Sequence, residues 1–187
     1  MARHFPSLLL LVTLLLPFLT NGDDDDSRCV YTVYVRTGSV IKSGTDATVG
    51  LTLADASGRE VSVPDLVAWG GLMGPAHDYF ERANLDVFSG RGPCGLGPLC
   101  RLNLTSDGWG PHHGWYCEYV EVTLTGPHTP CAQTLFYVRQ WLAADAAPYQ
   151  LYATVDGCGG GPARAHKAQQ HVMGRVVIGD GPNAESI

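Results

Sequence analysis

The sequence predicts an all-β domain, an antiparallel sandwich of two β-sheets with seven to eight strands. The first observation behind this prediction is that many short segments alternate apolar and polar residues, with the period of two of a strand that has one wet face. The second is that clusters of glycine and proline separate these segments, in a chain with 23 glycines and 12 prolines. Helical periodicity is not convincing anywhere, so two packed sheets are the expected architecture.

Residues 102–124 show the pattern most clearly, because they read as a strand, a polar turn and a second strand. The turn, residues 107–114, is rich in glycine, proline and histidine. Trp115 opens the second strand on its apolar face, but from Val120 onwards the apolar face lies one residue out of phase. This slip predicts a β-bulge at residues 118–119. Trp115 is expected to be buried as an anchor of the core.

The same alternation predicts six further strands. A turn is expected at residues 54–58, where aspartate, serine and glycine follow one another. Residues 141–147 allow at most one helical turn before Pro148. The further strands are expected at residues 31–36, 47–54, 61–63, 84–88, 136–138 and 149–155.

The two ends of the chain differ in composition from its middle. Residues 1–22 have a basic start and a leucine-rich core interrupted by proline, which predicts a secretory signal peptide cleaved after Gly22. Residues 23–28 contain four consecutive aspartates and are expected to be a solvated acidic linker. The domain is expected over residues 29–158. The glycine run that follows begins a tail of weak order, residues 159–187.

The charge of the chain narrows the classes of partner. The formal net charge is −6, and removal of residues 1–22, which include Arg3, changes it to −7. The sequence has no basic patch for nucleic acid and no run of lysine and arginine for anionic lipid. Contact with a membrane would therefore have to come from apolar loops or from a bridging cation.

Sequence motifs of common enzymes are missing. The chain contains neither a G-x-S-x-G nor an H-E-x-x-H motif, and no C-x-x-C spacing of the kind that zinc ribbons and thioredoxin-type sites use. His112 and His113 are adjacent, so they cannot easily face one metal together, and the histidines do not predict a zinc site. We therefore predict that the protein is not an enzyme. A hydrolase on a sandwich scaffold is kept as an alternative.

Several segments, taken in order, resemble the PLAT domain, the module of polycystins, lipoxygenases and bacterial alpha-toxins. The resemblance runs from about Cys29 to Cys158, and longer strings at residues 69–75 and 88–94 resemble the small stand-alone PLAT proteins of plants. The segments that carry it are residues 44–49 and 80–88, which look like the first two loops of the family, 104–108 with 113–122, which look like its middle, and 136–142, which look like its penultimate strand.

The resemblance implies a module that binds lipid or protein, because in the family catalysis belongs to separate domains. It also implies a role in plant stress response. The signal peptide adds a location in the secretory pathway, either the lumen of the endoplasmic reticulum or the extracellular space. A lectin-like, carbohydrate-binding sandwich is the alternative, since it would share the aromatic loops and the calcium of the first interpretation.

The resemblance further implies a calcium site in the loops at one end of the sandwich. Calcium takes six to eight hard oxygen ligands. In the first loop, Gly44 and Thr45 would supply carbonyl oxygens and Asp46 a carboxylate. In the second loop, Glu81 matches the family's acid, and Asp78 stands where the loop often has another oxygen donor. Asp107 is a candidate from a third loop. The competing interpretation is that Asp46 and Asp107 cap turns, as short acids often do.

Apolar loop tips are the second expected feature of the site. The resemblance implies that such tips dip into lipid, and the candidates for contact with a membrane or partner are Trp69, Leu72, Met73 and Trp109. For Trp69 the alternative is that its ring folds back under its own loop into the core.

The six cysteines and one sequon predict covalent features of a secreted protein. All six cysteines follow the signal peptide, so disulfides are expected. Cys94 and Cys100 flank a short loop that a disulfide could close. The resemblance implies that the first and last strands are neighbours, which would pair Cys29 with Cys158, and Cys117 with Cys131 is then left by elimination. Asn103 begins an N-glycosylation sequon on the polar face of its strand.

Overall fold

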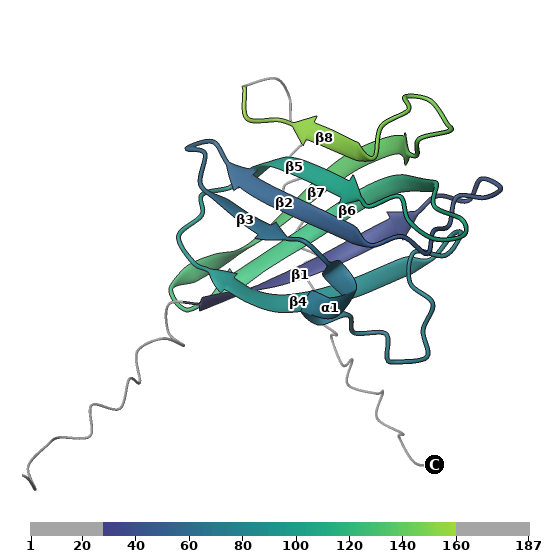
Figure 1. Ribbon diagram of the computed structural model, residues 1–187. Helices are drawn as coiled ribbons and strands as arrows, with labels where there is room; N and C mark the ends of the chain where they lie inside the picture. The colour runs from purple at the N-terminus through teal and green to yellow at the C-terminus, as the bar shows by residue number, and fades with distance from the viewer. Residues whose placement is uncertain (1–27, 160–187) are drawn as a thin grey trace, which may run out of the picture.

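The computed structural model describes residues 28–159, which form two packed β-sheets (Figure 1). One sheet has the strand order β4-β1-β6-β7 and the other β3-β2-β5-β8, and all neighbouring strands are antiparallel. The expected all-β sandwich is therefore confirmed. The elements are β1 (Arg28–Thr37), β2 (Val49–Asp55), β3 (Glu60–Val63), α1 (Leu66–Gly70), β4 (Leu85–Pro93), β5 (Leu99–Ser106), β6 (Trp115–Gly126), β7 (Thr129–Leu142) and β8 (Tyr152–Asp156).

The predicted signal peptide, acidic linker and C-terminal tail lie largely outside the described residues. The predicted signal peptide, residues 1–22, is wholly outside, as are most of the predicted linker and all but the first residue of the predicted tail. The first strand already begins at Arg28, the last residue of the predicted linker. Within residues 28–159, no helix is long and apolar enough to cross a membrane.

The core lies between the two sheets and is filled by alternate residues of the strands. Val33 and Val35 of β1 and Leu104 of β5 belong to one buried cluster, although they come from different sheets. Trp115 is fully buried, as the sequence predicts, and its indole Nε1 donates a hydrogen bond to Oγ1 of Thr37 at 3.0 Å. The polar atom of this large side chain is therefore satisfied inside the core.

The predicted β-bulge is present in β6. Arg36 of β1 pairs with Tyr119, but the next residue of β1, Thr37, pairs with Cys117. Glu118 therefore has no opposite residue on β1. Because of this extra residue, Trp115 and Cys117 before the bulge and the apolar residues after it all point into the core.

Three elements differ most from the expectation, and β8 begins at Tyr152, three residues later than the strand expected at residues 149–155. Residues 66–70 form a short helix, α1, whose N-cap Asp65 accepts a hydrogen bond from the amide of Ala68 at 2.9 Å. The strands β4 and β7 are longer than the alternation predicts. Their additional halves contain glycine or exposed polar residues, and they are held by pairing with β1 and β6 rather than by a buried face of their own.

The predicted disulfide pairing is wrong at every pair. The structure joins Cys29 to Cys94 and Cys100 to Cys158, each with a Cα–Cα distance of 5.0 Å. The expected Cys29–Cys158 pair fails because β1 and β8 lie in different sheets, and β8 pairs with β5 instead. The expected Cys94–Cys100 and Cys117–Cys131 pairs are excluded with it. Both Cys117 and Cys131 are free thiols, Cys117 buried and Cys131 exposed.

The antiparallel pairing collects four connections at one end of the sandwich, which we name the loop end. These connections follow β1, precede β4, join β5 to β6 and join β7 to β8. They lie on the right in Figure 1. Both disulfides lie at the opposite end, where β1 and β5 begin and where β4 and β8 finish. The loop end comprises residues 38–48, 71–84, 107–114 and 143–151.

Candidate calcium site

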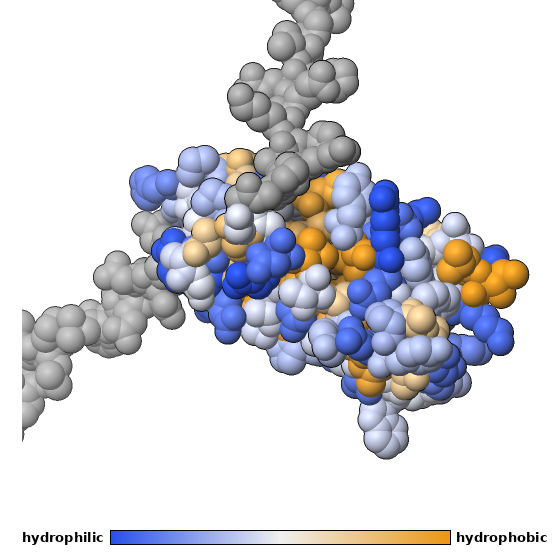
Figure 2. Space-filling view, turned by 90° about the horizontal axis from the view of Figure 1, so that it is seen from above, coloured by the Kyte–Doolittle hydropathy of each residue, from blue (hydrophilic) through white to orange (hydrophobic). Residues whose placement is uncertain are grey.

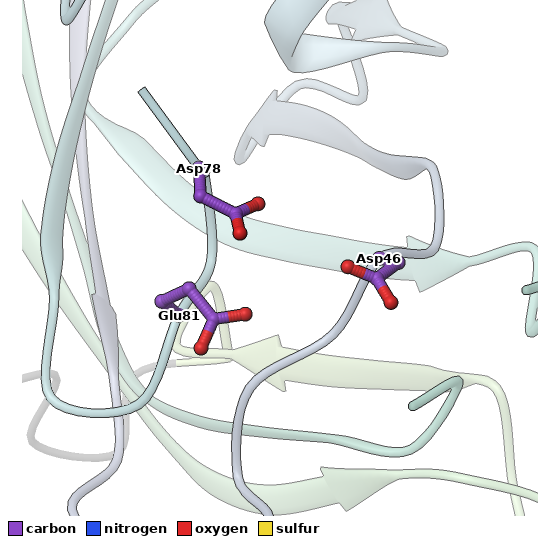
Figure 3. A group of neighbouring side chains, drawn as sticks. All are labelled: Asp46, Asp78 and Glu81. Carbon is purple, nitrogen blue, oxygen red and sulfur yellow. The ribbon is translucent and has the colours of Figure 1, made fainter. Parts of the chain in front are cut away.

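Three carboxylates from two connections of the loop end converge. Asp46 comes from residues 38–48, and Asp78 and Glu81 come from residues 71–84. One carboxylate oxygen from each lies within 4.8 Å of the other two. Figure 3 shows the side chains of Asp78 and Glu81 directed toward that of Asp46. Asp46 and Asp78 are exposed and Glu81 is half-buried, so the cluster is open to solvent on one side.

The first connection is held against the second by its backbone. The amide of Thr45 donates to the carbonyl oxygen of Phe80 at 3.3 Å. At position 44, a Cβ atom would lie 3.0 Å from the amide nitrogen of Arg82 and 3.2 Å from a carboxylate oxygen of Glu81. Glycine therefore permits the close approach of the two connections. It brings the backbone of Gly44 beside the carboxylate of Glu81.

The second connection, residues 71–84, is held in place by Asp86, a buried acid of β4 that the sequence does not single out. Asp86 is fully buried, and its Oδ2 accepts a hydrogen bond from the amide of Phe80 at 2.8 Å. Its Oδ1 lies 2.6 Å from Nε2 of His77. The only sequence signal for this role is an acid at an alternate position of the expected strand at residues 84–88. Asp86 therefore supports the segment that carries Asp78 and Glu81 without joining the cluster.

Asp107 lies outside the carboxylate cluster and caps a turn instead. Its Oδ1 accepts hydrogen bonds from the amides of Thr48 and Trp109, both at 3.0 Å. Some loss of hydration acts to raise the pKa of Asp107, but the hydrogen bonds from Trp109 and Thr48 outweigh it and hold the pKa below its ordinary value. The carboxylate of Asp107 therefore connects the turn at residues 107–110 to Thr48, two residues after Asp46.

The donor set fits calcium. Calcium prefers hard oxygen ligands, and carboxylates supply both the oxygens and the charge that the ion requires. The three carboxylates lie beside Gly44 and Thr45, the predicted carbonyl donors, which are both buried. The three grouped side chains offer oxygen alone, which disfavours zinc; the imidazole of His112, with Nδ1 3.5 Å from Oδ2 of Asp46, stands outside this group.

Most of the predicted apolar tips are exposed at the loop end. The exposed fractions are 79% for Trp109, 59% for Leu72 and 42% for Met73. Trp69 is different: it is half-buried on α1, and its indole packs over Gly90 of β4, where a Cβ atom would collide with the ring. The alternative interpretation, in which Trp69 folds back onto the core, is therefore the one that the structure bears out.

The loop end also exposes apolar residues that the sequence analysis did not select. Ile41 is 78% exposed, Tyr149 68% and Val40 47%. Figure 2 shows a group of hydrophobic residues at the same end of the molecule as the loops in Figure 1. No periodic signal points to Val40 and Ile41, because they lie in an irregular connection. Tyr149 belongs to the strand expected at residues 149–155, but β8 begins only at Tyr152. Together with Leu72, Met73 and Trp109 they form the set that we name the apolar tips.

The comparisons with known proteins give the family. The model of the PLAT/LH2 domain matches residues 31–154. The chain belongs to the PLAT/LH2 domain family. It is 50% identical over 161 residues to PLAT domain-containing protein 1 of Arabidopsis thaliana, covering 84% of this chain and 87% of that protein. It is 60% identical over 104 residues to PLAT domain-containing protein 3 of the same plant, covering 55% of this chain and all of that protein.

Solved structures agree with this PLAT fold. A crystal structure of a LOX variant matches with a TM-score of 0.51 and 19% identity, over 70% of this chain and 16% of the other chain. At this identity the likeness concerns the fold alone. The PLAT domain described here therefore has the same kind of sandwich as one part of a much longer protein.

The predicted glycosylation residue of this PLAT domain lies within a strand, outside the loop end that carries the carboxylate cluster. Asn103 sits in the middle of β5, paired with Thr52 on one side and Thr154 on the other. Its side-chain oxygen accepts a hydrogen bond from Oγ1 of Thr154 at 3.1 Å, and it is partly exposed. A glycan on Asn103 would project from the outer face of the sheet β3-β2-β5-β8, so occupancy of this site stays a prediction.

Proposed function

We propose that this PLAT domain is a non-enzymatic binding module of the secretory pathway that docks, with the help of calcium, on a membrane lipid surface or a partner protein. One observation carries the proposal: three converging carboxylates stand among exposed apolar tips at one end of the sandwich. Carboxylates alone are repelled by an anionic membrane. Exposed apolar residues alone can insert into lipid but provide no electrostatic attraction to its surface. Together they form a surface that becomes suited to a membrane once a cation is held.

The side chains of Asp46, Asp78 and Glu81 would hold the ion, with carbonyl oxygens of Gly44 and Thr45 as the predicted additional donors. When bound, calcium would supply local positive charge to a chain with a formal net charge of −6. That charge matters because an anionic bilayer repels an acidic protein, most strongly at low ionic strength.

The apolar tips would supply most of the affinity. Burial of one large apolar side chain stabilises a complex by about 1.5–3 kcal/mol. Two or three tips would thus bind reversibly, with an affinity comparable to that of a single lipid anchor. Because the tips come from different connections, the arrangement depends on the connections being held together at the loop end.

Sedimentation with phospholipid vesicles, in calcium and in chelator, tests the proposal. We expect binding in calcium only, and weaker binding for Asp46→Asn and for Trp109→Ala. Asp145→Asn is the matched control, because Asp145 is an exposed acid of the same end outside the cluster. Binding that is absent in both conditions, or equal in both and insensitive to Asp46→Asn, would exclude calcium-assisted docking on lipid. A glycan array in parallel would detect the lectin-like alternative.

The cellular part of the proposal rests on the cysteines and on the family. The two disulfides are typical of proteins that mature in an oxidising compartment, which supports the endoplasmic reticulum lumen or the extracellular space. The stress-response role that the family resemblance implies belongs to the same proposal. Disruption of the gene in its host, followed by comparison of growth with and without stress, would test it.

A further inference from the structure

The hydroxyl of Tyr79 connects the carboxylate cluster to one of the apolar tips. Tyr79 lies in the chain between Asp78 and Glu81, two members of the cluster. Its hydroxyl oxygen accepts a hydrogen bond from the amide of Met73 at 2.9 Å. Met73 and its neighbour Leu72 form the exposed tip of the same connection. One side chain thus links the acidic part of the connection to its apolar part.

The ring of Tyr79 is packed on more than one side. It packs against the core, with its centroid 5.3 Å from that of the buried Phe88 and 4.7 Å from that of His77. The backbone on its C-terminal side is fixed as well, because the amide of Phe80 donates to Asp86. A shift of the residues flanking Tyr79 would therefore move a packed aromatic ring, not a free side chain.

At Gly71, next to the Leu72–Met73 tip, the chain leaves room for the Tyr79 hydroxyl. A Cβ atom at this position would lie 2.5 Å from the Tyr79 hydroxyl oxygen, so the absence of a side chain leaves the space that the phenol occupies. On its other side the tip is anchored to β4, where the amide of Leu72 donates to the carbonyl of Val87 at 3.0 Å. Beyond that anchor, the Tyr79 hydroxyl holds the amide of Met73.

We propose that the Tyr79 hydroxyl couples calcium binding at the carboxylate cluster to the position of the Leu72–Met73 tip. The inference rests on the proposed function and adds its regulation. Calcium would fix Asp78 and Glu81, and Tyr79 between them would hold Met73 in the conformation that meets lipid. By reciprocity, lipid that fixes the tip would tighten calcium binding by the same factor.

The test is a calorimetric titration of calcium into the protein, without and with vesicles of equal parts phosphatidylcholine and phosphatidylserine. The ratio of the two calcium affinities is the coupling factor. In Tyr79→Phe the ring stays and the hydroxyl is lost, so calcium affinity without vesicles should stay within about twofold of wild type. The coupling factor should fall by about 2- to 10-fold, the range that one lost hydrogen bond corresponds to.

A second variant breaks the same contact from the other side. The backbone at Gly71 has φ −60° and ψ 123°, which alanine adopts readily, but Gly71→Ala would displace the phenol. It should lower the coupling factor in the same way. Tyr137→Phe is the matched control, because Tyr137 is an exposed tyrosine of β7, outside the loop end, and its coupling factor should equal that of wild type.

The outcomes separate this inference from the proposed function. If wild type shows a coupling factor well above one and Tyr79→Phe retains it, the coupling role of Tyr79 is wrong and calcium-assisted docking stands. If Tyr79→Phe loses calcium affinity even without vesicles, Tyr79 merely holds the ligands, and the inference is again overturned. If wild type binds no calcium, or if its coupling factor is one, both proposals fail together.

Discussion

The indole of Trp115 donates its hydrogen bond to Thr37, a residue 78 positions earlier in the chain, and both side chains are fully buried. Thr37 is the last residue of β1, and Trp115 is the first residue of β6. The bond therefore joins two strand ends directly beneath the loop end. The ring of Phe80, from the connection that carries Glu81, stands edge-on to the Trp115 indole at a centroid distance of 5.4 Å.

We predict that Trp115→Ala lowers the free energy of unfolding by about 3–5 kcal/mol, because it leaves a large cavity in a close-packed core. Thr37→Val should cost about 1–3 kcal/mol, since it keeps the shape but leaves the indole N–H without an acceptor. Urea unfolding followed by circular dichroism measures both. A loss below about 1 kcal/mol for Trp115→Ala would contradict the burial described here.

The calcium ligands can be distinguished from their neighbour Asp107. Glu81→Gln and Asp78→Asn should each lower calcium affinity about tenfold or more, because each removes a charged ligand. Asp107→Asn should leave it within about twofold, since an asparagine oxygen can still accept from the amides of Thr48 and Trp109. Calcium titration by calorimetry gives the three values. An Asp107→Asn effect as large as that of Glu81→Gln would return Asp107 to the ligand set.

Asp55 gives the fold a dependence on acid. Its buried carboxylate accepts hydrogen bonds from the Ser57 hydroxyl at 2.6 Å and from the amide of Gly97 at 2.8 Å, and pairs with Arg59. These bonds, the Ser57 hydroxyl first and the Gly97 amide second, hold the pKa of Asp55 far below its ordinary value against the opposing effect of burial. Because the folded pKa is lowered, the stabilisation is complete above the unfolded pKa of about 4 and is lost as the pH falls below it.

Asp55→Asn should therefore melt at a lower temperature than wild type at neutral pH, and the difference should shrink as the pH falls below about 4. Melting curves of the two proteins across this pH range measure it, with Asp145→Asn as the surface control. A difference that stays constant with pH would show that the charge of Asp55 is not the stabilising feature.

The two disulfides and two free thiols predict a labelling pattern. In the folded protein an alkylating reagent should modify Cys131 alone, because Cys117 is buried and burial raises the pKa of its thiol. After unfolding without reductant, Cys117 should react as well. Peptide mapping without reduction should recover Cys29 linked to Cys94 and Cys100 linked to Cys158, and a Cys29–Cys158 peptide would contradict the fold.

Glycosylation of Asn103 would test two features: passage of the protein through the secretory pathway and the accessibility of the outer face of β5. Expression through a secretory pathway should give a form of lower gel mobility that shifts on treatment with a glycosidase, and Asn103→Gln should abolish the shift. The other asparagines of the sequence, Asn21, Asn84 and Asn183, have no serine or threonine two positions later, so a single glycan is expected. A glycosidase-sensitive shift that persists in Asn103→Gln would contradict the assignment.

Local pattern was sufficient for the features that depend on near neighbours in the chain. The period of two placed the strands around Val33, Val35 and Leu104, since a strand with one buried face must alternate. The phase slip between Trp115 and Val120 predicted the bulge for the same reason. The family resemblance, rather than the pattern, selected Asp46, Asp78 and Glu81, and the structure brings these three together.

Only the tertiary structure could decide which distant segments meet. The cysteine pairing depends on whether β8 lies beside β1 or β5, and residues 58 positions apart carry no local signal of that choice. Trp69 lies on the core because Gly90, on another element, leaves room for its ring. The link from Tyr79 to Met73 likewise requires the path of an irregular connection, where no repeating backbone geometry constrains the side chains. Alternation is a property of one strand, whereas pairing, close approach and convergence are properties of two segments that only folding brings into contact.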